Sequence, residues 1–521
     1  MWQTLDVTTV PEILRFWANR AAESVALINE REAITFSSLD QRSSRTANRL
    51  LQANVKPGDH VGYLGLNSVG FFDAWFGAGK IGCAFAPFNW RLAPSELAEI
   101  IDDARPSIVF VDSGFREKAQ SVEALISTRC ELVFFDRATD EGGLQEWARG
   151  ASAKDPAFPI QAGNPALIAY TSGTTGRPKG VVLSHGAISN SFVSAEQEPA
   201  MRWTRDDVIL LSMPNFHLGG SCIALQALYN GSRITILSSF DVAGALAKIS
   251  RDRATIAPLV PAALQMILDD PRLSSTDLSS LRTIMYFGSA IGAETATRAQ
   301  AALRCSLVQH YGTTETWIAT ILRPEDHDPT KPERLASCGV AIPRVQIRVV
   351  DEAEKNVAPN VVGQVVIKCP TAFSGYLGQR QATEAVMRDG WYMTGDLGFL
   401  DADGYLTLVD RCKDMIVSGG ENVYSVEVER ALMRHPEVAA AAVIGTPDPK
   451  WGEKVTAFVV TTPGATVSTV DLGLHCRKFL AAYKSPKEII FEAALPMTAS
   501  GKIQKSILRR RFWGDGKRAI G

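Results

Sequence analysis

The segment at residues 170–180 constrains the fold of this chain more than any other stretch. It reads YTSGTTGRPKG, so hydroxyl side chains are crowded around two glycines, and Lys179 follows them. Apolar runs flank it at 166–169 and at 181–183, and both runs are typical of buried strands. The pattern therefore predicts a loop that joins two strands. A flexible linker is the plain alternative, but linkers rarely join two apolar strands.

The composition of this loop suits phosphate binding. Backbone N–H groups and hydroxyls can donate hydrogen bonds to phosphate oxygens, and a lysine adds positive charge. The loop does not match the pattern GxxxxGK[ST], which runs into a helix. The candidate phosphate-binding residues are Thr171, Ser172, Gly173, Thr174, Thr175, Gly176 and Lys179.

Length and composition exclude several classes of protein. With 521 residues, the chain is too long for one core, so at least two domains are expected. A formal net charge of −2 argues against a nucleic-acid or anionic-membrane partner. The most apolar stretch, 71–87, contains Asp73 and Lys80 and is too short to span a bilayer, and no signal peptide is apparent. Eight widely spaced cysteines indicate reduced thiols in a cytoplasmic protein, with no zinc site.

The organisation along the chain predicts an α/β fold. Strand-like runs alternate with helical patterns, which is typical of parallel sheets covered by helices. After Arg411 a small α/β unit begins, in which Ser425 is expected to cap a helix that runs to about Arg434. We expect the domain boundary here, with one domain at residues 1–412 and a second at 413–521.

Six further motifs follow the loop: NFH at 215–217, YGTTE at 311–315, YMTGD at 392–396, DRCKD at 410–414, GGEN at 419–422 and SGK at 500–502. In this order they resemble the adenylate-forming superfamily, which contains acyl-CoA synthetases, peptide-synthetase adenylation domains and beetle luciferases. The motif sequences are most similar to those of fatty-acyl and halobenzoate-type CoA ligases. The resemblance implies a large N-terminal domain of two doubly wound lobes plus a small β-barrel, with a small mobile α/β C-terminal lid.

The implied reaction is ATP-dependent ligation of a carboxylic acid to CoA, with Mg²⁺ as cofactor. A carboxylate is a poor electrophile, and its attack on ATP brings two anions together, so cations and oriented donors are needed around the phosphates. The expected partners are therefore a small carboxylic acid, ATP and CoA, without nucleic acid or an integral membrane segment. A homodimer is left open.

The resemblance assigns the nucleotide site residue by residue. Glu315 would hold Mg²⁺, Thr314 would contact the α-phosphate, and Tyr311 would supply a face for adenine. Asp396 would accept hydrogen bonds from the ribose hydroxyls, and Arg411 would reach ribose or phosphate. The same set includes Gly288, Ser289, Ala290, His310, Gly312 and Thr313. Taken alone, Glu315 would fit a helix N-terminus and Asp396 a structural turn.

The remaining assignments concern the acid, the lid and CoA. His217 would lie beside the acyl carboxylate, although the family usually has a residue other than Asn215 at that position. Gly288 and Trp317 would border a short or flat acyl pocket, which favours an aromatic or medium-chain acid, and Trp317 could equally be plain core. Lys502 would bridge carboxylate and α-phosphate, and Lys413 would be the hinge. The expected CoA contacts are Arg91, Gly419, Gly420, Glu421, Trp451 and Lys487, while Ser485 differs from some aryl-CoA ligases.

Three alternatives to a CoA ligase are weighed. The first is a free-standing adenylation enzyme that loads a carrier protein, and the second is a luciferase-like adenylating oxygenase. The third, an inactive binding protein, is disfavoured because none of the core motif residues is missing. The sequence does not identify the acid.

Overall fold

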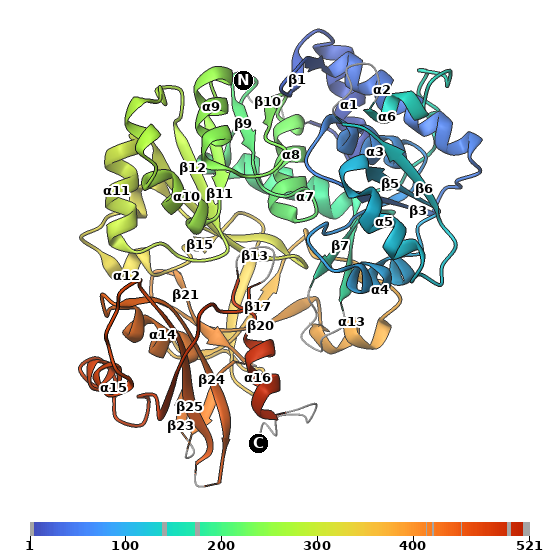
Figure 1. Cartoon of the computed structure of the whole chain (residues 1–521). Coiled ribbons are helices and arrows are strands. Elements are labelled where there is room, and N and C mark those ends of the chain that lie inside the picture. The colour runs from blue at the N-terminus through green and yellow to red at the C-terminus, as the bar shows by residue number, and fades with distance from the viewer. Residues whose placement is uncertain are drawn as a thin grey trace. The chain divides into compact units, whose positions relative to one another are not determined.

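Figure 1 shows the computed structural model, which describes residues 5–137, 143–171, 178–412, 414–418, 421–449, 451–497 and 502–513. The chain divides into two compact units: residues 1–347 with 367–392, and residues 348–366 with 393–521. The expected mixed α/β fold with a larger N-terminal and a smaller C-terminal part is confirmed. The domain boundary predicted between residues 412 and 413 stays a prediction, as does the hinge predicted at Lys413. Lys413 lies outside the described residues.

The first unit contains a sheet in which the described residues form nine strands. Its core strands β9 to β13 run parallel, and β14 and β15 extend it antiparallel. In spatial order the strands are β15 (Val340–Ala341), β14 (Trp317–Leu322), β13 (Ser306–Thr313), β12 (Thr283–Phe287), β11 (Ile256–Leu259), β9 (Val208–Leu211), β10 (Arg233–Ile236), β1 (Val25–Ile28) and β2 (Ala33–Thr35).

A second sheet of this unit holds both ends of the predicted phosphate loop. Strands β7 and β8 are antiparallel neighbours, as expected from the apolar runs that flank the loop. In spatial order the strands are β18 (Gly375–Tyr376), β8 (Lys179–Ser184), β7 (Pro165–Thr171), β4 (Ala84–Pro87), β3 (His60–Leu64), β5 (Ile108–Asp112) and β6 (Glu131–Phe135).

Helices cover these sheets. They are α1 (Val10–Arg20), α2 (Phe36–Gln52), α3 (Val69–Lys80), α4 (Pro94–Ala104), α5 (Arg116–Glu123), α6 (Gly143–Trp147), α7 (His185–Gln197), α8 (Leu218–Tyr229), α9 (Val242–Asp252), α10 (Pro261–Leu268), α11 (Ala293–Leu303), α12 (Pro332–Leu335) and α13 (Arg380–Val386). Short 3₁₀ turns lie at η1 (Ser113–Phe115), η2 (Pro199–Met201), η3 (Pro271–Ser275) and η4 (Pro324–Asp326). The apolar stretch after residue 70 is the buried helix α3 followed by β4. Among the helices that the structure describes, none is long and apolar enough to cross a bilayer.

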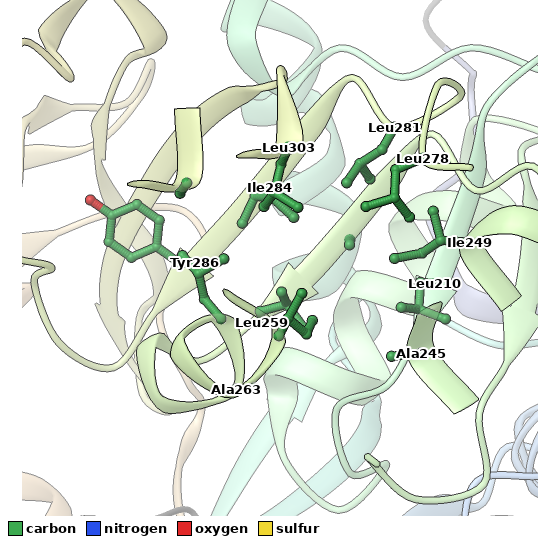
Figure 2. Packing of buried hydrophobic residues seen from close by; sticks show 14 of the residues in the cluster. Leu210, Ala245, Ile249, Leu259, Ala263, Leu278, Leu281, Ile284, Tyr286 and Leu303 are labelled. Carbon is green, nitrogen blue, oxygen red and sulfur yellow. The ribbon is translucent and has the colours of Figure 1, made fainter. Parts of the chain in front are cut away.

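One face of the nine-stranded sheet packs against α9, α10 and α11. Figure 2 shows Leu210, Ile284 and Tyr286 from the strands with Ile249 from α9 and Leu303 from α11 in one apolar cluster. Because side chains alternate along a strand, the residues between these point to the opposite face of the sheet. The face of the nine-stranded sheet that packs against these helices is therefore part of the apolar core.

The second unit is built on antiparallel strands. The chain passes between the units within β16 (Gln346–Val350), β17 (Gly363–Lys368) and β20 (Trp391–Leu400), and β19 (Met387–Arg388) belongs to the first unit. In the second unit β20 pairs with β21 (Leu406–Arg411). The remaining strands are β22 (Ile416–Ser418), β23 (Glu421–Val423), β24 (Val438–Asp448), β25 (Gly452–Thr461) and β26 (Glu488–Phe491).

Helices pack on both faces of the last sheet. Helices α14 (Ser425–Met433) and α15 (Thr469–Arg477) cover one face, and Leu508 of α16 (Lys505–Trp513) packs on the other. Ser425 differs from its predicted role. It is the first residue of α14, and its hydroxyl donates to Asp410 at 2.7 Å instead of capping the helix. The buried Asp410 offers a stronger, charge-assisted acceptor than a helix terminus does.

Candidate active site

Three predicted site segments lie at one edge of the nine-stranded sheet. The carboxyl ends of parallel strands meet at the same edge, where α/β proteins commonly bind their ligands. His217 comes from the segment after β9, Gly288 follows β12 and Glu315 follows β13. The topology therefore gathers at one edge three segments that are separated in the sequence.

His217 is held by a rigid turn. It is the N-cap residue of α8, is half-buried, and packs on Phe216 with ring centroids 4.5 Å apart. The adjacent Asn215 is buried and donates to the Leu66 carbonyl at 3.1 Å, while its own N–H donates to the Asn67 side chain at 2.9 Å. The unusual Asn215 thus anchors the turn, and Asn67 is a supporting residue that sequence reasoning missed.

Glu315 is oriented by a tyrosine from a distant segment. Its side chain is nearly buried, with 8% exposure, and Tyr376 donates its phenolic hydrogen to Oε1 at 2.8 Å. Its backbone carbonyl accepts from Phe373 at 2.7 Å. Burial and the neighbouring Glu315 carboxylate raise the pKa of Tyr376, and the same two causes raise the pKa of the buried Tyr392. Both phenols therefore stay protonated near neutral pH.

Lys179 contacts the same tyrosine, Tyr376, that donates to Glu315. Lys179 begins β8 opposite Thr171 of β7, and its Nζ lies 4.6 Å from the centroid of the Tyr376 ring. A cation over an aromatic face is attracted by the ring quadrupole. One tyrosine thus connects the lysine of the phosphate loop to the acid of the YGTTE motif. Ser172, Gly173, Thr174, Thr175 and Gly176 lie outside the described residues.

The antiparallel strands β13 and β14 lie very close together where they pair beside Glu315. Trp317 has a left-handed backbone with φ of 62°, which bulky residues rarely adopt. A Cβ on Gly312 would lie 1.7 Å from the Trp317 carbonyl oxygen, so only glycine fits there. Between them the hydroxyls of Thr313 and Thr316 are hydrogen-bonded at 3.1 Å. Trp317 is half-buried, so it is not a plain core residue.

The other predicted nucleotide residues of this unit lie along the same edge. Gly288 has a φ of 96°, and Ser289 and Ala290 after it are exposed. Tyr311 and Thr314 are half-buried, whereas His310 is buried within β13. The edge therefore offers accessible small residues at β12 and partly accessible polar ones at β13.

Arg91 packs beside the turn that carries His217. Its guanidinium carbon lies 4.7 Å from the ring centroid of Trp90 and 5.9 Å from that of Phe216. Partial burial lowers the pKa of Arg91. The arginine predicted to bind CoA is therefore fixed on two aromatic rings, one of which also supports His217.

The second unit brings together the other charged site residues. Asp396 and Arg411 are register partners of β20 and β21, and Arg411 Nε lies 3.2 Å from Asp396 Oδ1. Gly395, with a φ of 73°, allows the turn before Asp396. The charges of both residues reach the ammonium group of Lys502 and act on it in opposite directions. The predicted ribose acid, its arginine and Lys502 therefore lie in one cluster.

The predicted CoA residues of this unit share one end of its last sheet. Ser418 pairs with Glu421 on one side and with Gly452 on the other, which places Glu421 near the turn of Trp451. Trp451 is 41% exposed. Lys487 precedes β26, and its backbone N–H donates to Val455 of β25 at 2.8 Å. Gly419 and Gly420 lie outside the described residues.

Comparison with known proteins places the chain in a family. Residues 14–377 match the model of the AMP-binding enzymes, and residues 427–502 match the model of the AMP-binding enzyme C-terminal domain. A feruloyl-CoA synthase from an Amycolatopsis species is 36% identical over 95% of this chain and 97% of its own. The fatty acid–[acyl-carrier-protein] ligase ScoC of Streptomyces coeruleorubidus is 35% identical over 99% of this chain and 98% of its own.

A solved structure agrees with these relatives. ATP-bound MatB from Rhodopseudomonas palustris superposes with a TM-score of 0.87 at 30% identity, and the match covers 96% of this chain and 98% of that one. The chain therefore belongs to the family of AMP-binding enzymes. Within it, the chain is an AMP-forming acyl-CoA synthetase, which ligates an acid to CoA with ATP.

The close approach at Gly312 gives a testable prediction. Gly312→Ala should force β13 and β14 apart, lower the free energy of unfolding by about 3 kcal/mol and displace Glu315. A misplacement near 1 Å can cost about a hundredfold in rate, so pyrophosphate release should fall by tenfold or more. Thermal unfolding and a pyrophosphate assay measure the two effects.

Gly473→Ala is the matched control for this variant. Gly473 lies in α15 with nothing within 4 Å of an added Cβ, so alanine should stabilise by about 0.5–1 kcal/mol and leave the rate unchanged. If Gly312→Ala kept the stability and the rate of the wild type, β13 and β14 would tolerate a side chain where they pair, and the prediction would be wrong.

Proposed function

We propose that the residues at the carboxyl edge of the nine-stranded sheet, together with the Asp396–Arg411–Lys502 cluster, activate an aromatic or fatty carboxylic acid as its adenylate. The connection from Lys179 through Tyr376 to Glu315 is the observation that carries this proposal. It joins the lysine of a phosphate loop to a carboxylate suited to hold the metal of a metal–nucleotide complex. A lysine and a metal-binding carboxylate that are held near each other can both help to offset the charge of bound phosphates.

In the proposed first step, an oxygen of the substrate carboxylate attacks the α-phosphorus of ATP. The bond between the α-phosphorus and the bridging oxygen breaks, and pyrophosphate leaves with its electron pair. Lys179 and Lys502 would offset the charge that builds up as the two anions meet. Thr314 would donate to the α-phosphate, and His217 would orient the acid.

The residues fit Mg²⁺ as the metal. Among the described residues, no three His, Cys, Asp or Glu side chains form a metal site of their own. Mg²⁺ suits such a site, because it usually binds one or two carboxylates together with substrate phosphates and water. Glu315 would be the protein ligand, and Tyr376 fixes the orientation of its carboxylate. When bound, the ion neutralises phosphate charge.

The proposed contacts of adenosine concern its ribose and its base. Asp396 would accept from the ribose hydroxyls, with Arg411 beside it, because a nearly buried carboxylate is a strong acceptor. Adenine would lie against Tyr311 and Gly312 near Thr313 and the backbone of His310. Gly288, Ser289 and Ala290 would border it at the end of β12, where the chain lacks bulky side chains.

In the proposed second step, the CoA thiol loses its proton and attacks the acyl carbonyl, and AMP leaves as the thioester forms. Arg91 and Lys487 would pair with CoA phosphates, and the segment 419–421 and Trp451 would contact the rest of CoA. The lid, residues 413–521, would turn at Lys413 between the steps, exchanging Lys502 for the CoA-binding residues.

For the acid, we propose an aromatic or a medium- to long-chain fatty substrate. The half-buried Trp317 at the start of β14 would limit the depth of the pocket, while Gly288 leaves room for a flat ring. The feruloyl-CoA synthase and ScoC relatives support the aromatic and the fatty class respectively. We further propose a cytoplasmic location, since all eight cysteines are thiols in the structure. A homodimer stays a prediction, which light scattering can test.

The test of this function is pyrophosphate release with a panel of aromatic, short-chain and fatty acids, each with and without CoA. Release that depends on the acid, followed by thioester and AMP when CoA is present, would support the ligase. Transfer only to a phosphopantetheinylated carrier protein would favour the carrier-loading alternative. Light emission or acid-dependent O₂ consumption would favour the oxygenase.

Lys502 should separate the two half-reactions. Lys502→Ala should slow acyl-AMP formation by about a hundredfold or more, because a cation is lost where two anions meet. Given synthetic acyl-AMP and CoA, the variant should still form thioester at nearly the wild-type rate. The measurements are rapid-quench adenylation and thioester formation from the adenylate.

Arg510→Ala removes a neighbouring exposed cation and serves as the control, with little expected effect on either half-reaction. Both variants should keep the wild-type melting temperature, since exposed side chains contribute little to stability. If Lys502→Ala lowered the rates of adenylation and of thioester formation equally, the proposal that the lid serves the two steps in turn would be wrong.

Arg91 and Lys487 should serve CoA and not adenylation. Each change to alanine removes a charge-assisted phosphate contact worth about 1.5–3 kcal/mol, so the KM for CoA should rise roughly tenfold to a hundredfold. The rate of acyl-AMP formation should be nearly unchanged. Lys478→Ala, an exposed lysine of the same unit as Lys487, is the control. An unchanged KM for CoA in both test variants would remove these residues from the CoA site.

A further inference from the structure

A lysine of α5 holds the loop that carries Arg91. Lys118 Nζ donates to the Trp90 carbonyl at 2.7 Å and to the Leu92 carbonyl at 2.9 Å. These two carbonyls flank Arg91 in the chain, so one ammonium group fixes the backbone on both sides of it. Hydrogen bonds from a charged donor are stronger than those between neutral groups. Lys118 therefore sets the position of the backbone from which the Arg91 side chain extends.

The place of Lys118 in α5 is not explained by the helix itself. Lys118 lies in the first turn of this helix. A cation there opposes the partial positive charge of the helix N-terminus, so the helix gains no stability from it. Partial burial lowers the pKa of Lys118, and the charge of Glu96 in α4 raises it. The contacts of this lysine therefore lie outside its own helix, in the loop 89–92.

The loop is a tight turn whose N–H groups are already bonded. Asn89 Oδ1 accepts from the backbone N–H of Arg91 at 3.0 Å, and the Asn89 carbonyl accepts from the N–H of Leu92 at 3.1 Å. The N–H of Ala93 donates to the Glu96 carboxylate at 2.8 Å. The lysine of α5 then supplies a donor to two carbonyls of the same turn. The loop is thus held through both its donors and its acceptors.

Two aromatic contacts hold the Trp90 ring, on which Arg91 lies. The centroid of this ring is 5.7 Å from that of Phe115 and 6.1 Å from that of Phe216. Phe115 directly precedes α5, so a ring and an ammonium group from one helix start reach the same loop. The Arg91 guanidinium carbon lies 4.7 Å from the Trp90 centroid, where a cation is attracted by the ring face. The start of α5 therefore supports both the backbone and the ring beneath Arg91.

The turn that carries His217 has a support of its own. The backbone N–H of Asn215 in this turn donates to the Asn67 side chain at 2.9 Å. Asn67 follows β3, so this support comes from a segment other than α5. A displacement of the loop 89–92 should therefore move Arg91 and leave His217 in place.

We infer that Lys118 is a positioning residue for CoA, which holds Arg91 in the orientation that pairs its guanidinium with a CoA phosphate. This rests on the proposed function, in which Arg91 binds CoA. An arginine that is free to move loses rotamer freedom when it binds a phosphate, and one that is held in place beforehand loses less. Lys118 thus contributes to the affinity for CoA through Arg91, and it contributes nothing to adenylation.

A double-mutant cycle tests this role by the KM for CoA in thioester formation. Lys118→Met removes the ammonium group and keeps an apolar side chain. It should raise the KM for CoA by about three- to tenfold, because pre-organisation is only part of the contact made by Arg91. In the Arg91→Ala background the same change should raise the KM by less than about twofold further, since two residues that act through one contact are not additive.

Three further measurements separate positioning from a merely structural role. The rate of acyl-AMP formation in Lys118→Met should stay near that of the wild type. Lys118→Arg keeps a cationic donor, so its KM for CoA should lie closer to the wild-type value than that of Lys118→Met. Lys56→Met, a change at an exposed lysine of the same unit, is the control and should leave the KM for CoA unchanged.

The outcomes distinguish this inference from the proposed function. If the wild type forms no thioester with any acid, or if Arg91→Ala leaves the KM for CoA unchanged, the proposed function fails at that point and the positioning role fails with it. If Arg91→Ala raises this KM but Lys118→Met does not, or if the two effects multiply in the double variant, only the positioning role is wrong. A parallel loss of acyl-AMP formation in Lys118→Met would also overturn it. Should Lys118→Met not fold, Lys118→Gln in the same cycle decides by the same criteria.

Discussion

The hydrogen bond from Tyr376 to Glu315 is the interaction on which the site of the first unit depends. Tyr376 belongs to the two-residue strand β18, which pairs with β8 just beyond Lys179. Around it, Phe373 donates to the Glu315 carbonyl, and Leu377 donates to the Gly180 carbonyl at 2.8 Å. One short segment thus ties the phosphate-loop strand of one sheet to the acid motif of the other. The segment thereby holds the lysine and the carboxylate near each other.

Much of this arrangement could be predicted from the sequence because its determinants are local. The loop is recognisable from its own residues and its two apolar flanks, and the structure confirms those flanks as neighbouring strands. The family and the reaction class follow from short contiguous motifs. The helix beginning at Ser425 was also found, but the partner of its hydroxyl was not, because Asp410 competes with the helix end and lies in a separate strand.

The parts that escaped prediction depend on pairing between distant segments. Tyr376 is 61 residues from Glu315, and no pattern around it indicates a polar contact. Asn67 supports the turn of His217 from 148 residues away. The left-handed backbone of Trp317 arises where β14 begins to pair with β13, so it could be found only from their register.

The positions of the charged side chains match the parts of the substrates that they would bind. Charged side chains gather where phosphates and ribose would bind: Lys179 and Glu315 in one unit, and Asp396, Arg411 and Lys502 in the other. A charge buried beside an apolar acid would cost more than it returns, whereas the same charge beside a phosphate is offset directly.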